Sequence, residues 1–214
     1  MQALIFDVDG TLAETEEVHR RAFNAAFAAA GVPWHWEPEL YRELLRTTGG
    51  KERMASYQER LPAGDRLDWD AIKALHADKT ARYAAMLAEG RLELRPGVRD
   101  LVAAGRAAGL ALGVATTTSR SNIEALTQCC WGQAADEVFD VLAAGDEVAA
   151  KKPAPDVFEL ALERLGLPPA ACLAFEDSPM GLASARAAGL EVVVTPSPYG
   201  PRDADFSAAK VVLP

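Results

Sequence analysis

Short apolar runs alternate with amphipathic helical patterns along most of the 214-residue chain. The apolar runs predict strands at Ala3–Phe6, Ala111–Ala115, Val138–Leu142, Cys172–Phe175, Leu190–Val194 and Val211–Leu213. Apolar residues three and four apart predict helices at Val98–Ala108, Ser121–Gln128, Pro155–Leu165 and Met180–Ala188. Such alternation is typical of a parallel sheet covered on both faces, so we expect a Rossmann-like, doubly wound α/β core.

This alternation is interrupted between residues 14 and 94, where the sequence favours helices throughout. They are expected at Glu14–Ala30, Glu37–Arg46, Lys51–Arg60 and Trp69–Glu89, with glycine and proline turns between them. We therefore predict two domains, a catalytic core of residues 1–13 and 95–214 and an inserted all-helical cap of residues 14–94. The two junctions would form a paired linker on which the cap closes as a lid.

Composition narrows the possible partners. A net charge of −9 argues against nucleic acid, because phosphate backbones are bound by clustered Lys and Arg. No run of 18 apolar residues is present to span a membrane, and Asp7 interrupts the apolar start before it is long enough for a signal peptide. Three cysteines in no disulfide or zinc pattern fit a reducing compartment. We expect a cytoplasmic monomer that acts on a small molecule.

Polar side chains follow three of the predicted strands. They are Asp7 and Asp9 after the first strand, Thr116–Ser119 after the second, and Glu176-Asp177 after the run that begins at Cys172. The carboxyl ends of parallel strands share one crevice, so these groups are expected to converge. A carboxylate there can attack phosphorus while its neighbour handles the proton of the leaving group. The pattern predicts a phosphate-transferring enzyme.

A carboxylate approaches a phosphate dianion only where positive charge offsets their repulsion. Mg²⁺ prefers oxygen ligands and provides that charge, so we predict a magnesium cofactor. Asp7 and Asp177 would bind it through their carboxylates and Asp9 through its backbone carbonyl.

These motifs resemble those of the haloacid dehalogenase superfamily, and the resemblance covers essentially the whole chain. The strings that carry it are DVDGT from Asp7, ATTTS from Ala115, the Lys152-Pro153 pair, and EDSPMG from Glu176. The resemblance implies that Asp7 is the nucleophile that forms an aspartyl-phosphate and that Asp9 is the general acid and base. It further implies that Thr116 binds the transferring phosphoryl group beside Thr117, that Lys152 orients Asp7, and that Asp177 and Glu176 hold the metal. True dehalogenases of the superfamily lack an acid at the position of Asp9, so dehalogenation is not expected.

Each assignment has a structural alternative. The two acids after the first strand would then cap a turn, the threonines would form an ordinary loop, and Asp177 would cap a helix. Lys151 and Lys152 are equivalent surface charges on residue type alone, and only the resemblance selects Lys152.

The predicted cap contains a second candidate anion site. In the string TTGGKER from Thr47, a glycine turn opens a helix, so Gly50 and Lys51 would present an N–H group and a cation to a second phosphate. The alternative is a simple turn between helices with surface charges.

This string and ETEEVH from Glu14 resemble the CbbY branch of the superfamily. The resemblance implies a phosphatase linked to the Calvin cycle that converts xylulose 1,5-bisphosphate, an inhibitor of Rubisco, to xylulose 5-phosphate. It also implies that Glu16, His19 and Lys79 contact the substrate or close the lid. The alternative that His19 is merely packed or solvated, with no direct role, stays open. The competing functions are a β-phosphoglucomutase-like phosphomutase, another sugar-phosphate or phosphoglycolate phosphatase, and an inactive metabolite sensor.

Overall fold

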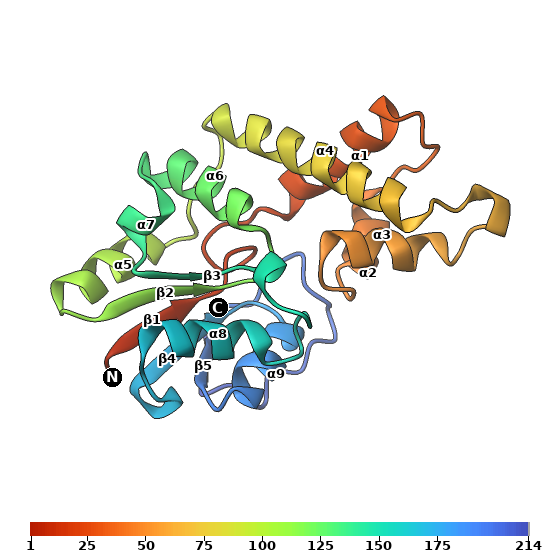
Figure 1. The fold of residues 1–214 in the computed structure, drawn as a ribbon. Helices are drawn as coiled ribbons and strands as arrows, with labels where there is room; N and C mark the ends of the chain where they lie inside the picture. Colours follow the sequence, from red (N-terminus) through yellow and green to blue (C-terminus); the bar gives the residue numbers. More distant parts are fainter. Residues whose placement is uncertain (214) are drawn as a thin grey trace.

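The computed structural model describes residues 1–213 (Figure 1), and Pro214, the last residue of the predicted core range, lies outside the described residues. Its strands form one parallel sheet in the order β3-β2-β1-β4-β5-β6. The strands are β1 (Ala3–Phe6), β2 (Ala111–Ala115), β3 (Val141–Ala143), β4 (Cys172–Glu176), β5 (Glu191–Val194) and β6 (Val211–Val212). The first strand therefore lies inside the sheet, between β2 and β4, and the predicted fold class is confirmed.

Helices cover both faces of the sheet because successive side chains of β1 point to opposite sides. Leu4 and Phe6 pack with α5 (Val98–Ala107), α6 (Arg120–Trp131) and α7 (Ala135–Val138). Ala3 and Ile5 face α8 (Asp156–Leu165) and α9 (Pro179–Ala187). Short 3₁₀ turns lie at Ala63–Asp65, Gly145–Glu147 and Pro169–Ala171.

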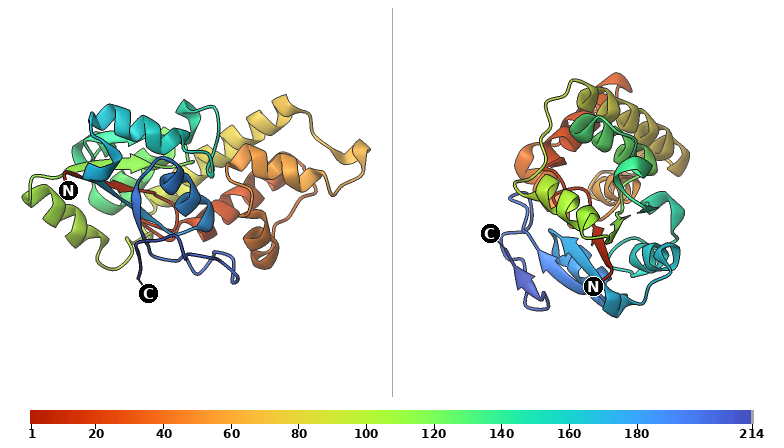
Figure 2. Two further views of the ribbon diagram at one scale, coloured as in Figure 1. Left: turned by 90° about the horizontal axis from the view of Figure 1, so that it is seen from below. Right: turned by 90° about the vertical axis from the view of Figure 1, so that its left-hand side faces the viewer.

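Four helices between β1 and α5 gather beyond one end of the sheet (Figures 1 and 2). They are α1 (Glu16–Ala29), α2 (Pro38–Leu44), α3 (Gly50–Gln58) and α4 (Trp69–Ala88). Trp34 and Trp36 are buried with Phe27 in a hydrophobic core of their own. All four helices fall inside the predicted cap range, and the division into two domains stays a prediction. No helix within residues 1–213 is both long and apolar enough to cross a membrane.

The chain enters and leaves these four helices side by side. Ala13 pairs with Leu94 in an isolated antiparallel bridge, and the Arg95 N–H donates to the Leu12 carbonyl at 2.8 Å. The two segments that connect the helices to the sheet are thus held together at one point.

Several predicted boundaries differ from the observed ones by one to three residues, and two of these differences affect the sheet. The strand expected from Val138 begins at Val141, because Val138 ends the short helix α7, which periodicity did not reveal. The Glu137 carboxylate accepts from the Ala134 N–H at 2.9 Å and so starts this helix. Glu176 is the last residue of β4 rather than the first residue after it. A short apolar run does not by itself distinguish a strand from a buried helical turn.

We expect Phe27→Ala to lower the free energy of unfolding by about 3–5 kcal/mol, because a fully buried ring leaves a cavity among the cap aromatics. Urea unfolding measures the loss. Trp69→Ala is the matched control: this ring is 49% exposed, so its removal should cost no more than about 0.5 kcal/mol. Equal effects of the two substitutions would contradict a packed cap core.

Candidate active site

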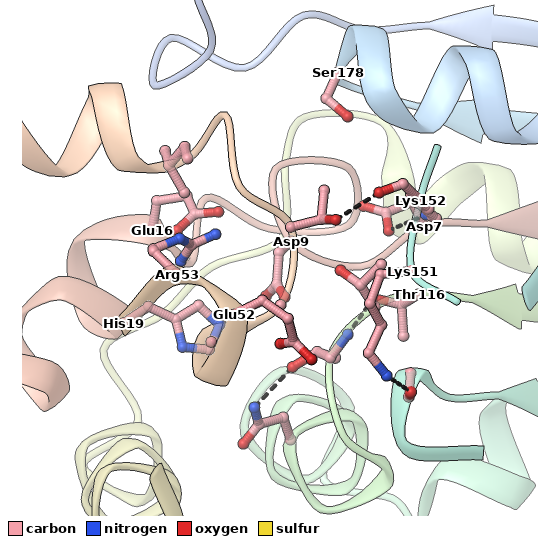
Figure 3. Close-up of a pocket in the computed structure, with 18 of the residues that line it drawn as sticks. Asp7, Asp9, Glu16, His19, Glu52, Arg53, Thr116, Lys151, Lys152 and Ser178 are labelled. Atoms are coloured by element: carbon pink, nitrogen blue, oxygen red, sulfur yellow. Dashed lines mark hydrogen bonds and ion pairs between the residues drawn. The ribbon is translucent and has the colours of Figure 1, made fainter. Parts of the chain in front are cut away.

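The polar segments at the carboxyl ends of β1, β2 and β4 meet the cap helices at one pocket (Figure 3). Its cavity measures about 160 Å³. The loops that follow the strands contribute Asp7, Asp9, Thr116, Thr117 and Asp177 to its lining, and the loop before α8 contributes Lys152. The cap helices contribute Glu16, His19, Gly50, Lys51, Arg53 and Lys79. Of the predicted site residues, only Glu176 does not line the pocket, and it lies directly behind it.

Lys152 is the centre of a buried cluster at the end of the sheet. Its Nζ donates to Asp7 Oδ1 at 2.7 Å, to Glu176 Oε1 at 2.5 Å and to the Ala115 carbonyl at 2.9 Å. Ligand atoms of Asp7, Glu176 and Asp177 all lie within 4.8 Å of one another. Lys151 instead donates to the Gly145 carbonyl, so Lys152 is the lysine that contacts Asp7.

This cluster has too little positive charge. Three carboxylates face one ammonium group, which leaves two negative charges uncompensated when all three are ionised. Burial raises the pKa of Asp7, and burial with the neighbouring charge of Glu176 raises the pKa of Asp177 well above its usual value. Burial also raises the pKa of Glu176 to about 7. Hard oxygen ligands that lack compensating charge fit a divalent cation such as Mg²⁺.

The carboxylates do not contribute equally. Glu176 already accepts from Lys152 through one oxygen and from the Asp177 N–H through the other, at 3.1 Å. Asp177 does not cap a helix, because Ser178 is the N-cap of α9. Asp7 also accepts through both oxygens, from Lys152 and from the Thr11 hydroxyl. Within residues 1–213 the Asp177 carboxylate accepts no hydrogen bond, so its oxygens are the ones available to a cation that lies beside Asp7.

Gly10 allows the turn that follows β1 to pack closely against Asp177. Its φ of +83° is a conformation that favours glycine, and an added Cβ would lie 2.3 Å from Asp177 Oδ2. The next residue, Thr11, donates its hydroxyl to Asp7 Oδ2 at 3.2 Å.

Asp9 turns away from the cluster and toward the cap. Its Oδ1 accepts from the Thr15 hydroxyl at 2.6 Å and lies 3.0 Å from His19 Nε2. Burial opposes the charge of Asp9, but these interactions outweigh burial and lower its pKa to about 2. The carboxylate of Asp9 therefore lies outside the cluster of Asp7, Glu176 and Asp177. Only the backbone carbonyl of Asp9 is left as a metal ligand, which is the group predicted from the sequence to bind the metal.

His19 and Lys79 form a buried chain behind Asp9. Lys79 Nζ lies 2.7 Å from His19 Nδ1 and 4.6 Å from the centre of the Phe23 ring. Burial lowers the pKa of His19 to about 4 and that of Lys79 to about 7. A neutral His19 accepts from Lys79 and donates to Asp9. The imidazole also stacks on Tyr83 at 4.0 Å, so it both packs and contacts a site residue.

The threonines after β2 present hydroxyl donors. Thr116 Oγ1 accepts from the Thr118 N–H at 3.2 Å, which leaves its own hydrogen free to donate into the pocket. Thr118 Oγ1 accepts from Asn122 Nδ2 at 2.7 Å in the same way. This arrangement suits an anionic group.

The cap side of the pocket carries the cations Lys51 and Arg53 and one acid with a raised pKa, Glu16. Lys51 lies in the first turn of α3, after Gly50, which packs against His76. The Tyr41 hydroxyl donates to Glu16 Oε2 at 2.8 Å and accepts from Arg53 Nη1 at 3.0 Å. Burial raises the pKa of Glu16 to about 7. Thr48 joins the cap to the core through the Lys152 carbonyl.

Sequence reasoning missed several lining or contacting residues. They are Thr15, Arg53, Asn122, Ser197 and Tyr199. A signal existed for Thr15, which lies four residues before His19 on the same helical face. The segment with Ser197 and Tyr199 contains no motif, and only the fold brings it to the pocket.

The fold and this acid–lysine cluster define a hydrolase of the phosphate-transferring class. The sequence matches the haloacid dehalogenase-like hydrolase family over residues 1–189. The chain belongs to this family, and it is a phosphatase.

Individual relatives are similar over more than nine tenths of their length. Protein CbbY of Rhodobacter capsulatus is 60% identical, and the match covers 100% of this chain and 93% of the relative. A crystal structure of mutant CbbY from Rhodobacter sphaeroides in complex with xylulose-(1,5)bisphosphate is 51% identical with a TM-score of 0.95, over 100% of this chain and 93% of that one. β-Phosphoglucomutase from Clostridium difficile, 20% identical with a TM-score of 0.79 over 100% and 91% of the two chains, shares the fold.

We expect Gly10→Ala to lower phosphatase kcat by about 100-fold, because the new methyl group displaces the Asp177 carboxylate. Phosphate release measures the effect. Gly31→Ala is the matched control, since this glycine has a φ of +66° with nothing within 4 Å of an added Cβ. If both variants kept the wild-type kcat, close packing of Gly10 against Asp177 would not matter for catalysis.

Proposed function

We propose that the chain is a Mg²⁺-dependent sugar-bisphosphate phosphatase that converts xylulose 1,5-bisphosphate to xylulose 5-phosphate and so protects Rubisco. The observation that carries this proposal is the Asp7 carboxylate, held by Lys152 beside Asp177 and facing a cap surface that bears Lys51. The sugar bisphosphate in the related CbbY complex supports the substrate.

The proposed reaction has two steps. Asp7 attacks phosphorus while the carboxyl of Asp9 protonates the departing sugar oxygen, which leaves an aspartyl-phosphate on Asp7. Thr116 and Lys152 hold the phosphoryl oxygens during this transfer. Asp9 then takes a proton from water as the water attacks the phosphoryl group, and the bond between phosphorus and the Asp7 oxygen breaks to release inorganic phosphate and free Asp7. A Mg²⁺ ion held by Asp7, Asp177 and the Asp9 carbonyl would neutralise phosphate charge when bound.

The cap contacts of Asp9 favour one of its two protonation states. Thr15 and His19 both donate to its carboxylate, so they stabilise the charged form that accepts a proton from water. For the first step, Asp9 must carry a proton, and a shift away from these donors would raise its pKa. We propose that Asp9 moves away from Thr15 and His19 when the substrate enters beneath the cap.

We assign the second phosphate to the cap. Lys51 provides charge, Gly50 provides an N–H at the start of α3, and Arg53 lines the same pocket. Glu16, His19 and Lys79 line the same pocket, where they would contact the sugar hydroxyls or help close the cap.

We expect Asp7→Asn to release no phosphate above background, because an amide is not a nucleophile. Phosphate release from a panel of sugar mono- and bisphosphates, with and without EDTA, measures this. Asp9→Asn should keep substrate binding and lose turnover. Phosphate release also separates a phosphatase from a phosphomutase, which would return the phosphoryl group to sugar. Substantial Mg²⁺-dependent turnover by Asp7→Asn would refute the nucleophile assignment.

We expect Lys51→Ala to raise the KM for xylulose 1,5-bisphosphate by about tenfold, the effect of losing one charge-assisted hydrogen bond, and to leave the KM for a monophosphate nearly unchanged. Steady-state kinetics on both substrates measures the difference. Lys73→Ala, which removes a half-exposed cap lysine paired with Asp70, is the control. Equal effects of Lys51→Ala on the two substrates would remove the second phosphate site.

A further inference from the structure

Arg95 lies where the chain returns from the cap helices to the core. Its backbone N–H holds the outgoing segment at Leu12, beside the bridge between Ala13 and Leu94. Its side chain is only 15% exposed and contacts three separate segments of the chain.

The guanidinium group of Arg95 has four oxygen neighbours. Nη1 donates to the Gly10 carbonyl and, at 2.7 Å, to the Thr195 carbonyl. Nη2 donates to the Pro196 carbonyl at 3.1 Å, and Nε lies 3.3 Å from Glu14 Oε1. These oxygens belong to the turn after β1, the segment after β5 and the first cap linker.

Each of these segments reaches the active site. The turn with Gly10 contains Asp9 and packs against Asp177. The segment after β5 continues to Ser197 and Tyr199, which line the pocket, and the Ser197 hydroxyl donates to Glu14 Oε2 at 2.9 Å. One side chain therefore fixes the catalytic turn, a pocket wall and a cap linker relative to one another.

We propose that Arg95 is a positioning residue that holds the catalytic turn and the 195–199 segment in the arrangement needed for turnover and ties that arrangement to the cap linkers. It acts through Gly10 and Glu14 and touches no substrate. Only the planar fork of arginine offers five donors in fixed directions, whereas lysine offers a compact charge with three.

The test is phosphate release by Arg95→Lys and Arg95→Ala, with whichever phosphomonoester the wild-type enzyme cleaves fastest. This choice makes the test independent of the xylulose assignment. We expect kcat to fall by about 100-fold in both variants, because small displacements of the catalytic turn have effects of that size. The KM should change little, and both variants should remain folded under the assay conditions, as urea unfolding verifies. Arg99→Ala is the matched control, since Arg99 contacts the Cys130 carbonyl and none of these segments.

Chemical rescue separates positioning from stability. The Arg95 side chain is 15% exposed, so the position vacated in Arg95→Ala is open to a small ion from solvent. Guanidinium chloride, far below unfolding concentrations, should restore part of the kcat of Arg95→Ala and leave Arg99→Ala unchanged. Glu14→Gln should lower kcat less in the Arg95→Lys background than in the wild type, because both act through one network.

Three results would overturn the proposal. They are wild-type kcat in both Arg95 variants, a loss of activity that matches the fraction of unfolded protein, and a guanidinium effect that is the same in Arg95→Ala and Arg99→Ala. A merely structural arginine would give the second of these results, since a free ion at low concentration does not refold an unstable protein.

Discussion

The site depends on how Lys152 compensates the carboxylates that surround it. Its ammonium group is buried and binds Asp7, Glu176 and a backbone carbonyl at the end of the sheet. A buried ion pair is tolerated only when its partners are close and fully hydrogen-bonded, and removal of one partner leaves a costly unpaired charge. Asp177 adds another carboxylate without adding a cation, so the pocket is built to attract positive charge.

The sheet order explains how these groups come together. Because β1 lies between β2 and β4, the residues that follow these three strands form one continuous edge. Asp7, Thr116 and Asp177 each come directly after a strand, so register alone brings them close. A protein with a net charge of −9 can bind an anion here because the cations of the cap and Lys152 act locally, within the screening length of salt.

The cap supplies the contacts that distinguish Asp9 from Asp7. Two carboxylates one residue apart occupy different environments: Asp7 faces Lys152, and Asp9 faces Thr15 and His19. Burial raises the pKa of Asp7, whereas the donors from the cap lower that of Asp9 to about 2. The contacts of Asp9 favour the ionised form that accepts a proton from water, and Lys152 opposes the effect of burial on Asp7 and so favours its ionised form.

The sequence alone predicted the parallel sheet and the convergence of the polar residues that follow three of its strands. It could do so because the carboxyl ends of parallel strands share one edge of the sheet. It did not predict that Asp9 turns to the cap, because the partners of its carboxylate depend on how α1 meets β1. The contact between His19 and Lys79 spans 60 residues, and the contacts of Arg95 with Gly10 and Thr195 span 85 and 100. Such contacts have no local pattern and follow only from tertiary packing.

The most direct test of this account is calorimetric titration of the substrate-free protein with Mg²⁺. The wild-type chain should bind one ion, and Asp177→Asn should weaken binding by at least about 100-fold, more than the usual loss of an outer-shell partner. Asp136→Asn, at an exposed acid on α7, should bind as the wild type does. Equal affinity of the wild type and Asp177→Asn would contradict a cation site between Asp7 and Asp177.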